Sequence, residues 1–265
     1  MSEFDHTRVS LGKSSYVHDE RTLLMTKFML PHFRIPAVWD FDKHRAKFPL
    51  PFWGNDTYGD CVIAGEANHV FRLERLEQRR TVPLTDQDAI KRYMMLTGCK
   101  APGDAHDVGL EVIGAMRNWR SQGFQSAYKN RSYLIAAYGE LDPQDGAQLR
   151  SANYLLHGIH FGFWLPAAAK QMTRNKVWDY QGQTGAEWQP GSWGGHLVYS
   201  KAFDPDGFEI LTWGMKVKVT NAFIEKYCDE AWAVVDNLNT WDIKLRVDVA
   251  AIEKELSQIT SKVDQ

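Results

Sequence analysis

Apolar residues recur at helical spacing in the part of the chain that begins at residue 61. The first stripe predicts a helix over residues 61–80. Thr85 with Asp88 resembles a capping box in front of a second helix over residues 89–96. A third stripe predicts a helix that Gly123 ends. Its apolar positions, expected in the core, are Val108, Val112, Ala115, Met116 and Trp119.

After residue 126 the pattern changes to short apolar runs typical of strands. Two of these runs, 197–203 and 208–212, are joined by turn residues and predict a β-hairpin. Further strands are expected at 133–138, 158–165, 215–219 and 230–235, and helices at 143–156, 221–228 and 247–259. Helices followed by an antiparallel sheet predict an α+β fold.

The domain organisation follows from where these patterns begin and end. Residues 1–50 carry few periodic signals and several prolines, so we expect an extended arm laid over the domain, with a cleavable inhibitory pro-segment as the alternative. Residues 51–240 are expected to form one α+β domain. Residues 241–265 are expected to form a helical tail that packs on the domain or on a partner.

Composition restricts the function classes. The chain has 265 residues, of which 44% are hydrophobic, enough to bury a full core. A formal net charge of -2 gives no overall field toward nucleic acid or an anionic membrane, so neither partner is expected. No apolar run approaches the ~20 residues that a membrane-spanning helix requires.

Cysteine and histidine usage indicates neither a disulfide framework nor a metal site. Three cysteines without CxxC spacing favour a reducing compartment, and no signal peptide is visible. His157 and His160 have a spacing seen in metal sites, but no nearby ligand completes one. We therefore expect no metal and no cofactor, and a location in the cytoplasm unless the protein travels in a phage particle.

Cys61 is the strongest candidate for chemistry. Loop-forming residues precede it and the predicted helix begins at it, so the helix N-terminus should lower the thiol pKa. Asp60 beside it opposes this effect. Asn55, six residues earlier, offers a side-chain amide to an oxyanion, beside the backbone N–H of Cys61. A small buried cysteine without reactivity is the ordinary alternative.

His196 is the candidate base. It follows a loop rich in glycine and tryptophan and leads into an apolar strand. Trp193 and Gly195 lie in this loop and are candidates to shape a substrate cleft, although packing is the more common role for such tryptophans. A histidine after two glycines is also common as a turn residue.

Together these residues resemble the papain-like cysteine peptidase superfamily: an amide residue six positions before a helix-opening cysteine, a distant Gly-His before a strand, and a Trp-Gly after a hairpin. The resemblance implies Cys61 as nucleophile, His196 as base and Asn55 as oxyanion donor. Leu211 stands where that superfamily has the Asn that orients the histidine. Thr212 is expected to take over that task, with Glu209 or a backbone carbonyl as alternatives. Trp213 is expected to shield the contact from water, unless its ring serves only the core.

The chain is also similar to phage and bacterial proteins with this fold, over roughly residues 50 to 260. The shared pattern comprises the segments 54–61, 194–196, 212–214 and 227–231. The resemblance implies hydrolysis or transfer at a peptide or other acyl group. The alternative is an inactive papain-like fold kept as a binding or structural module, for example in a phage particle.

Overall fold

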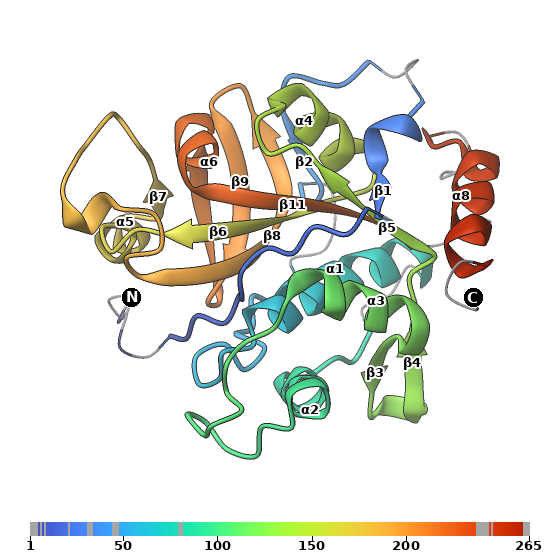
Figure 1. Cartoon of the computed structure of the whole chain (residues 1–265), viewed down its shortest axis with the longest axis horizontal. Helices are drawn as coiled ribbons and strands as arrows, with labels where there is room; N and C mark the ends of the chain where they lie inside the picture. Colours follow the sequence, from blue (N-terminus) through green and yellow to red (C-terminus); the bar gives the residue numbers. More distant parts are fainter. Residues whose placement is uncertain are drawn as a thin grey trace.

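A computed structural model describes residues 5, 7, 9–20, 22–30, 34–43, 48–78, 82–236, 244 and 246–261. Figure 1 shows a helical half and a sheet half packed against each other. The helical half contains α1 (Cys61–Gln78), α2 (Asp86–Thr97) and α3 (Val112–Gln122). Beside these helices, β3 (Phe124–Ser126) and β4 (Arg131–Tyr133) form a separate two-stranded sheet.

The described residues of the other half form a nine-stranded sheet in the order β1-β5-β11-β6-β8-β9-β10-β7, with β2 also paired to β8. Neighbours are antiparallel except at the pairs β1–β5 and β7–β10. The strands are β1 (Leu23–Leu24), β2 (Trp39–Asp40), β5 (Ala137–Leu141), β6 (Ile159–Leu165), β7 (Val177–Trp178), β8 (Gly194–Asp204), β9 (Gly207–Thr212), β10 (Met215–Thr220) and β11 (Cys228–Val235). Helices in one half and a largely antiparallel sheet in the other confirm the α+β prediction.

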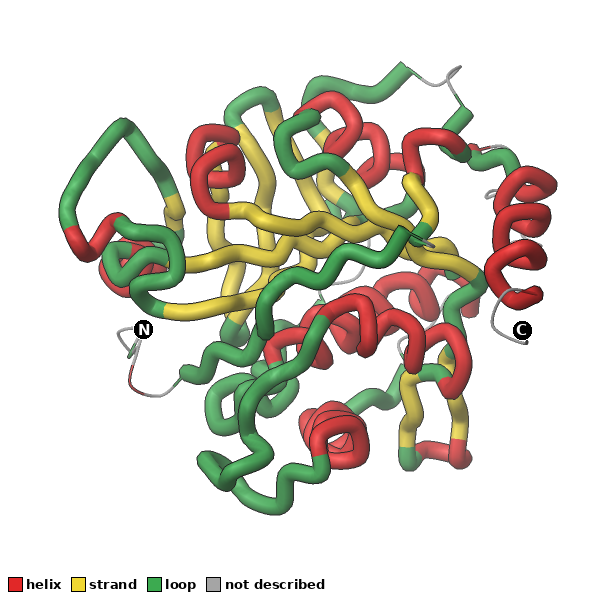
Figure 2. The backbone as a smooth tube through the Cα atoms, viewed as in Figure 1, coloured by secondary structure: helices red, strands yellow, loops and turns green. Residues whose placement is uncertain are grey.

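Short helices accompany the sheet: α4 (Gly146–Leu155), α5 (Ala169–Arg174), α6 (Asn221–Tyr227) and the C-terminal α8 (Val249–Ser261). Single 3-10 turns are η2 (Met25–Lys27), η3 (Tyr128–Asn130) and η4 (Ala186–Trp188). In Figure 2, α4 and α6 lie on the side of the sheet away from the helical half. Among the described residues no helix is both long and apolar enough to cross a membrane.

Two hydrophobic clusters form the core, one on each side of the sheet. The first lies among the strands, α4 and α6, and the second packs α1, α2 and α3 against the facing side of the sheet. Leu197 on β8 and Trp232 on β11 belong to the second cluster. A buried histidine pair also joins the halves, because His69 Nδ1 on α1 lies 2.9 Å from His160 Nε2 on β6.

Most predicted elements are present, with two corrections. Val108 is 71% exposed, because α3 begins at Val112 and the chain before it is loop. The single strand expected at 133–138 is in fact the end of β4 and the start of β5. The capping box at Thr85 and Asp88 is present, and it starts α2 at Asp86, three residues earlier than expected.

The N-terminal arm contributes to the sheet and crosses the boundary between the halves. β1 pairs with β5, and β2 pairs with β8. In Figure 1 the arm, in blue, runs between the sheet half and α1. This course brings residues 9–14 to the first residue of α1, where the candidate nucleophile lies.

Candidate active site

Cys61 is the first residue of α1 and is buried, with 1% of its surface exposed. Its sulfur accepts a hydrogen bond from the backbone N–H of Leu197 on β8, at 3.4 Å. Since Leu197 follows His196 directly, the fold brings the candidate nucleophile and the candidate base together from positions 135 residues apart. This contact is between the helical half and the sheet half.

His196 is also buried, and its two ring nitrogens have different surroundings. Nε2 lies 2.7 Å from the hydroxyl oxygen of Thr212 at the end of β9. Among the described residues, Nδ1 has no hydrogen-bond partner. An imidazole held at one nitrogen and unpartnered at the other, on the residue before the one that binds the thiol, is suited to act as a general base.

The Trp213 side chain covers the His196 ring. The Trp213 ring stacks on the His196 ring with centroids 4.2 Å apart and an interplanar angle of 17°. Trp213 and Gly214 connect β9 to β10 with φ values of 45° and 69°, the left-handed conformation that a two-residue type I′ turn needs at both positions. Such a conformation is uncommon for a tryptophan, which has a Cβ, and costs some backbone strain. Trp193, 5.3 Å from Trp213 between centroids, adds a second ring outside it.

Thr212, not Glu209, holds the imidazole. The Glu209 carboxylate pairs with Lys201, with Oε1 2.7 Å from Nζ, so the alternative that Glu209 orients His196 is wrong. Leu211 is buried on β9 opposite Tyr199 of β8. The hydroxyl of the next residue therefore provides the hydrogen-bonding atom that a leucine lacks.

Asn55 lies in the loop before α1 and is buried. Its Nδ2 donates to the carbonyl oxygen of Tyr58 at 3.1 Å, which fixes the orientation of the amide. The same nitrogen donates, also at 3.1 Å, to the carbonyl oxygen of Ser10 in the N-terminal arm. Trp213 Nε1 donates to this Ser10 oxygen as well, at 3.2 Å. Asn55 thus already binds a peptide carbonyl, the type of group that an oxyanion donor must recognise.

The arm fills the space in front of the reactive pair. Leu110 N–H donates to the carbonyl of Gly12 at 2.8 Å, and Ser14 N–H donates to the carbonyl of Leu110 at 3.0 Å. On the opposite edge, Lys13 N–H donates to the carbonyl of Gly195 at 3.1 Å. Residues 12–14 of the arm are therefore hydrogen-bonded like a strand on both edges, to Leu110 on one side and to Gly195 on the other.

Glycines make this close approach possible. A Cβ at Gly12 would overlap the carbonyl group of Gly59, and a Cβ at Gly195 would overlap the carbonyl oxygen of Lys13. Gly195, predicted to shape a cleft, is thus in contact with the chain that lies there.

Burial under the arm sets the electrostatics of the pair. It raises the pKa of the Cys61 thiol to about 12, although hydrogen bonds from the backbone of Leu197 and Gly12 act in the opposite direction. The Asp60 carboxyl raises it further, as the sequence predicts. Burial likewise lowers the pKa of His196 to about 3. With the arm in place, which we call the closed form, both groups are uncharged. Desolvation outweighs the effect of the helix N-terminus, so the thiol pKa is raised and not lowered.

Three further buried histidines, His69, His157 and His160, have structural surroundings. His69 and His160 bind each other, and His157 Nε2 lies 3.1 Å from Arg246 Nη1. The part of the chain that the structure describes has no group of three or more side chains able to hold a metal ion.

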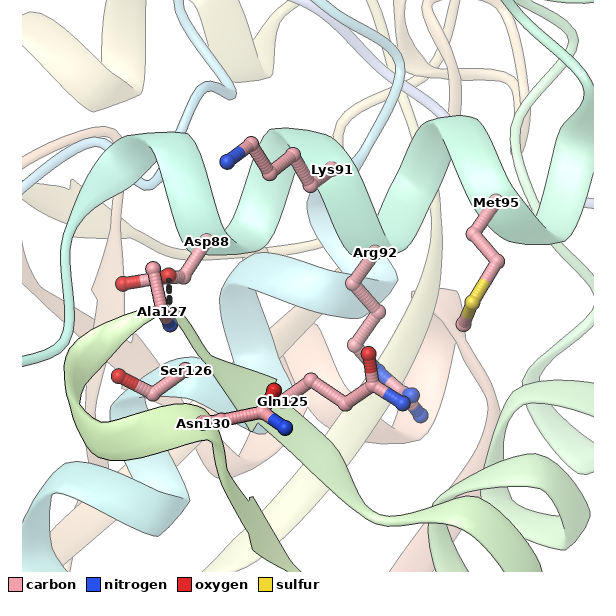
Figure 3. Close-up of a pocket in the computed structure, with 8 residues that line it drawn as sticks. All are labelled: Asp88, Lys91, Arg92, Met95, Gln125, Ser126, Ala127 and Asn130. Carbon is pink, nitrogen blue, oxygen red and sulfur yellow. Dashed lines mark hydrogen bonds between the residues drawn. The ribbon is translucent and has the colours of Figure 1, made fainter.

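A separate pocket of about 290 Å³ lies between α2 and the turn after β3 (Figure 3). Asp88 accepts a hydrogen bond from the Ala127 backbone at its wall. Its lining residues are Asp88, Lys91, Arg92, Met95, Gln125, Ser126, Ala127 and Asn130. It shares no residue with the Cys61 site.

Solved structures with a similar fold are cysteine proteases. Xylellain from Xylella fastidiosa superposes with a TM-score of 0.66 at 15% identity, over 87% of this chain and 97% of that one. The Carica candamarcensis protease CMS1MS2 gives 0.52 at 12%, over 77% and 100%. Procathepsin L 3 of the Tenebrio molitor larval midgut gives 0.55 at 12%, over 86% and 77%. No family model and no curated protein matches the sequence. The chain thus has the papain-like cysteine protease fold, as the sequence resemblance implies.

Sequence reasoning missed the part of the site that comes from the arm. Ser10, Gly12 and Lys13 carry no local signal, since nothing in the pattern of residues 9–14 says where the segment packs. The acidic pair Asp229 and Glu230 is visible inside the segment 227–231. The role of these two carboxylates becomes visible only in the structure, where they bind the side chain of Lys13 from the arm.

Proposed function

We propose that the protein is a cysteine hydrolase that acts on a peptide or another acyl group. Cys61 attacks the acyl carbon, while His196 accepts the thiol proton and returns it to the leaving group. Asn55 and the Cys61 backbone amide stabilise the oxyanion. Thr212 holds the imidazole, and Trp213 shields that hydrogen bond from water.

One observation carries the proposal: the Cys61 sulfur contacts the residue after His196, while Thr212 holds one nitrogen of that imidazole and the other has no partner among the described residues. The combination matters more than the unpartnered nitrogen, since the buried His69 and His160 also have one: among the histidines that the structure describes, only at His196 does a hydroxyl hold the ring where the adjoining backbone N–H binds a cysteine at a helix start. In the closed form the two groups are uncharged. Activity therefore requires that the arm leave, which lets water return to the pair and removes most of the desolvation that separates the two pKa values.

An inactive binding or structural module is the second candidate. Leu211 at the orienting position and the fully covered Cys61 favour it. A place in the cytoplasm or in a phage particle belongs to either proposal, and the net charge of -2 keeps nucleic acid and membranes outside both.

The test is the rate of iodoacetamide alkylation at Cys61 between pH 6 and 9, followed by mass spectrometry of the cysteine peptides. It compares Gly12→Ala, in which the arm cannot hold its place, with Gly12→Ala/His196→Ala. An activated pair gives rapid labelling near neutral pH that drops at least tenfold without His196, since an ordinary thiol has a pKa of ~8.5. Slow labelling that is indifferent to His196 would favour the inactive module.

A further inference from the structure

The side chain of Lys13 enters a closed pocket beside the reactive pair. None of it is exposed, and its Nζ lies 2.8 Å from Asp229 Oδ2 and 2.9 Å from Glu230 Oε1 at the start of β11. Nζ also donates to the carbonyl oxygen of Ser14 at 3.2 Å. The cation is therefore almost completely surrounded by acceptors.

The remaining walls are shaped for a long cationic side chain. The Trp164 ring on β6 has its centroid 5.0 Å from Lys13 Nζ, within the range of a cation–π contact. Gly162, also on β6, leaves room for the stem, since a Cβ there would overlap Lys13 Cε. Trp232 Nε1 donates to Glu230 Oε2 at 2.7 Å and fixes the carboxylate without help from the arm.

Without a cation this pocket is electrostatically unfavourable. Burial raises the pKa of Glu230, and the neighbouring Asp229 carboxylate acts in the same direction, whereas Lys13 opposes both effects. If the arm leaves, two adjacent carboxylates lose their cationic partner, while Trp232 still holds Glu230 beside Asp229. Neighbouring like charges repel each other, so the vacated pocket favours another cation.

The pocket is placed so that one bound chain can reach both it and the reactive pair. Lys13, whose side chain fills the pocket, donates its backbone N–H to the carbonyl oxygen of Gly195, the residue before His196. The preceding residue, Gly12, packs against the carbonyl group of Gly59, two residues before Cys61. Any extended peptide can make these main-chain contacts, which resemble the addition of a strand to a sheet. The pocket then selects for one side chain of the peptide.

From this arrangement we infer that the Asp229–Glu230 pocket is the specificity pocket of the cleft, and that it selects a lysine or arginine side chain in an extended peptide substrate. In the closed form Lys13 occupies it. That the bound peptide is a substrate rests on the proposed hydrolase function. The binding of a basic peptide can be measured without catalysis.

The binding test uses the full chain with Gly12→Ala, Lys13→Ala and Cys61→Ser, so that the arm is displaced and no hydrolysis occurs. A fluorescent peptide with the sequence of residues 9–16 is titrated by anisotropy, beside the same peptide with norleucine in place of lysine. We expect the norleucine peptide to bind at least tenfold more weakly. Adding Glu230→Gln should weaken the lysine peptide to a similar extent. The matched control is Glu225→Gln, which removes an exposed carboxylate on α6 and should leave affinity unchanged.

Failure of the pocket and failure of the hydrolase are distinguishable. Equal affinity for the two peptides, or no binding of either, overturns the pocket. A second experiment restores Cys61 and follows the cleavage of a peptide mixture by mass spectrometry. We expect lysine or arginine at one fixed position relative to the cleaved bond. Cleavage indifferent to basic residues also overturns the pocket while supporting the hydrolase. Lysine-dependent binding without any cleavage leaves the pocket in place and contradicts the hydrolase.

Discussion

At the scale of single residues, the candidate site differs from the papain-like peptidases that the sequence resembles at the group that would orient the histidine. Leucine occupies that position, and the hydroxyl of the neighbouring Thr212 contacts His196 Nε2 at 2.7 Å. A hydroxyl can fix the tautomer of a ring, but it carries no charge to stabilise an imidazolium. The Thr212 contact therefore positions the base with less electrostatic help than a carboxylate would give.

Thr212→Val should remove this hydrogen bond with little change of shape. His196 Nε2 then lies buried without a partner, so the free energy of unfolding should fall by about 1–3 kcal/mol. Thr212→Ser keeps the hydroxyl and should retain more stability, although it loses a methyl group. Urea denaturation of the three proteins at pH 7.5 gives the comparison. An equal loss in both variants would mean that the methyl group, and not the hydroxyl, stabilises this site.

At the scale of elements, the N-terminal arm packs against the loop before Cys61 and the residue before His196. It covers Cys61 by inserting Gly12 against Gly59, a fit that a side chain at residue 12 would prevent. Burial raises the pKa of this thiol to about 12. The anchor of the arm is the ion pair of Lys13, buried beside β11.

Gly12→Ala should release the arm and expose the thiol. We expect alkylation of Cys61 at pH 8 to be at least tenfold faster than in the wild type, because a solvated thiol ionises near its ordinary pKa of ~8.5. Gly103→Ala is the control: it also adds a methyl group to a loop glycine, but nothing lies within 4 Å of the new atom. Labelling at the same slow rate in all three proteins would show that the arm does not protect Cys61.

At the scale of the whole molecule, the two halves meet through buried histidines as well as apolar side chains. Burial lowers the pKa of His160 to about 3 and that of its partner His69 well below its ordinary value. Both are neutral in the folded protein at pH 5, whereas the unfolded chain protonates them near pH 6.5. The unfolded state therefore binds more protons at these residues, and their contribution to stability is lost as pH falls below about 6.5.

His160→Gln should make stability less sensitive to acid. Each histidine that stays neutral on folding contributes a slope of about 1.4 kcal/mol per pH unit below its unfolded pKa. The free energy of unfolding of the variant should therefore decrease less than that of the wild type between pH 6.5 and 5, measured by denaturant titration. His106→Gln, at an exposed position, is the matched control. Parallel pH curves for wild type and His160→Gln would contradict the assignment of a buried neutral histidine.

The sequence by itself determined the longer elements of the fold and the candidate residues of the site. Hydrophobic periodicity and capping are local properties, so α1, α2 and the β8–β9 hairpin could be read from spacing, and so could Cys61 at a helix start. Predictions failed where local pattern and tertiary contact disagree. Val108 continues a helical stripe, yet the chain there is a loop whose neighbour Leu110 pairs with the arm.

Only the tertiary structure decided which groups meet and in what charge state. The sequence predicts Thr212 as the partner of His196 with Glu209 as an alternative; in the structure Glu209 pairs with Lys201 and Thr212 contacts His196. The helix start at Cys61 predicted a low thiol pKa, but burial under a segment some fifty residues earlier in the chain reversed it. Desolvation and ion pairing depend on atoms that are distant in sequence, and for this reason the Lys13 pocket could not be found before the arm was placed.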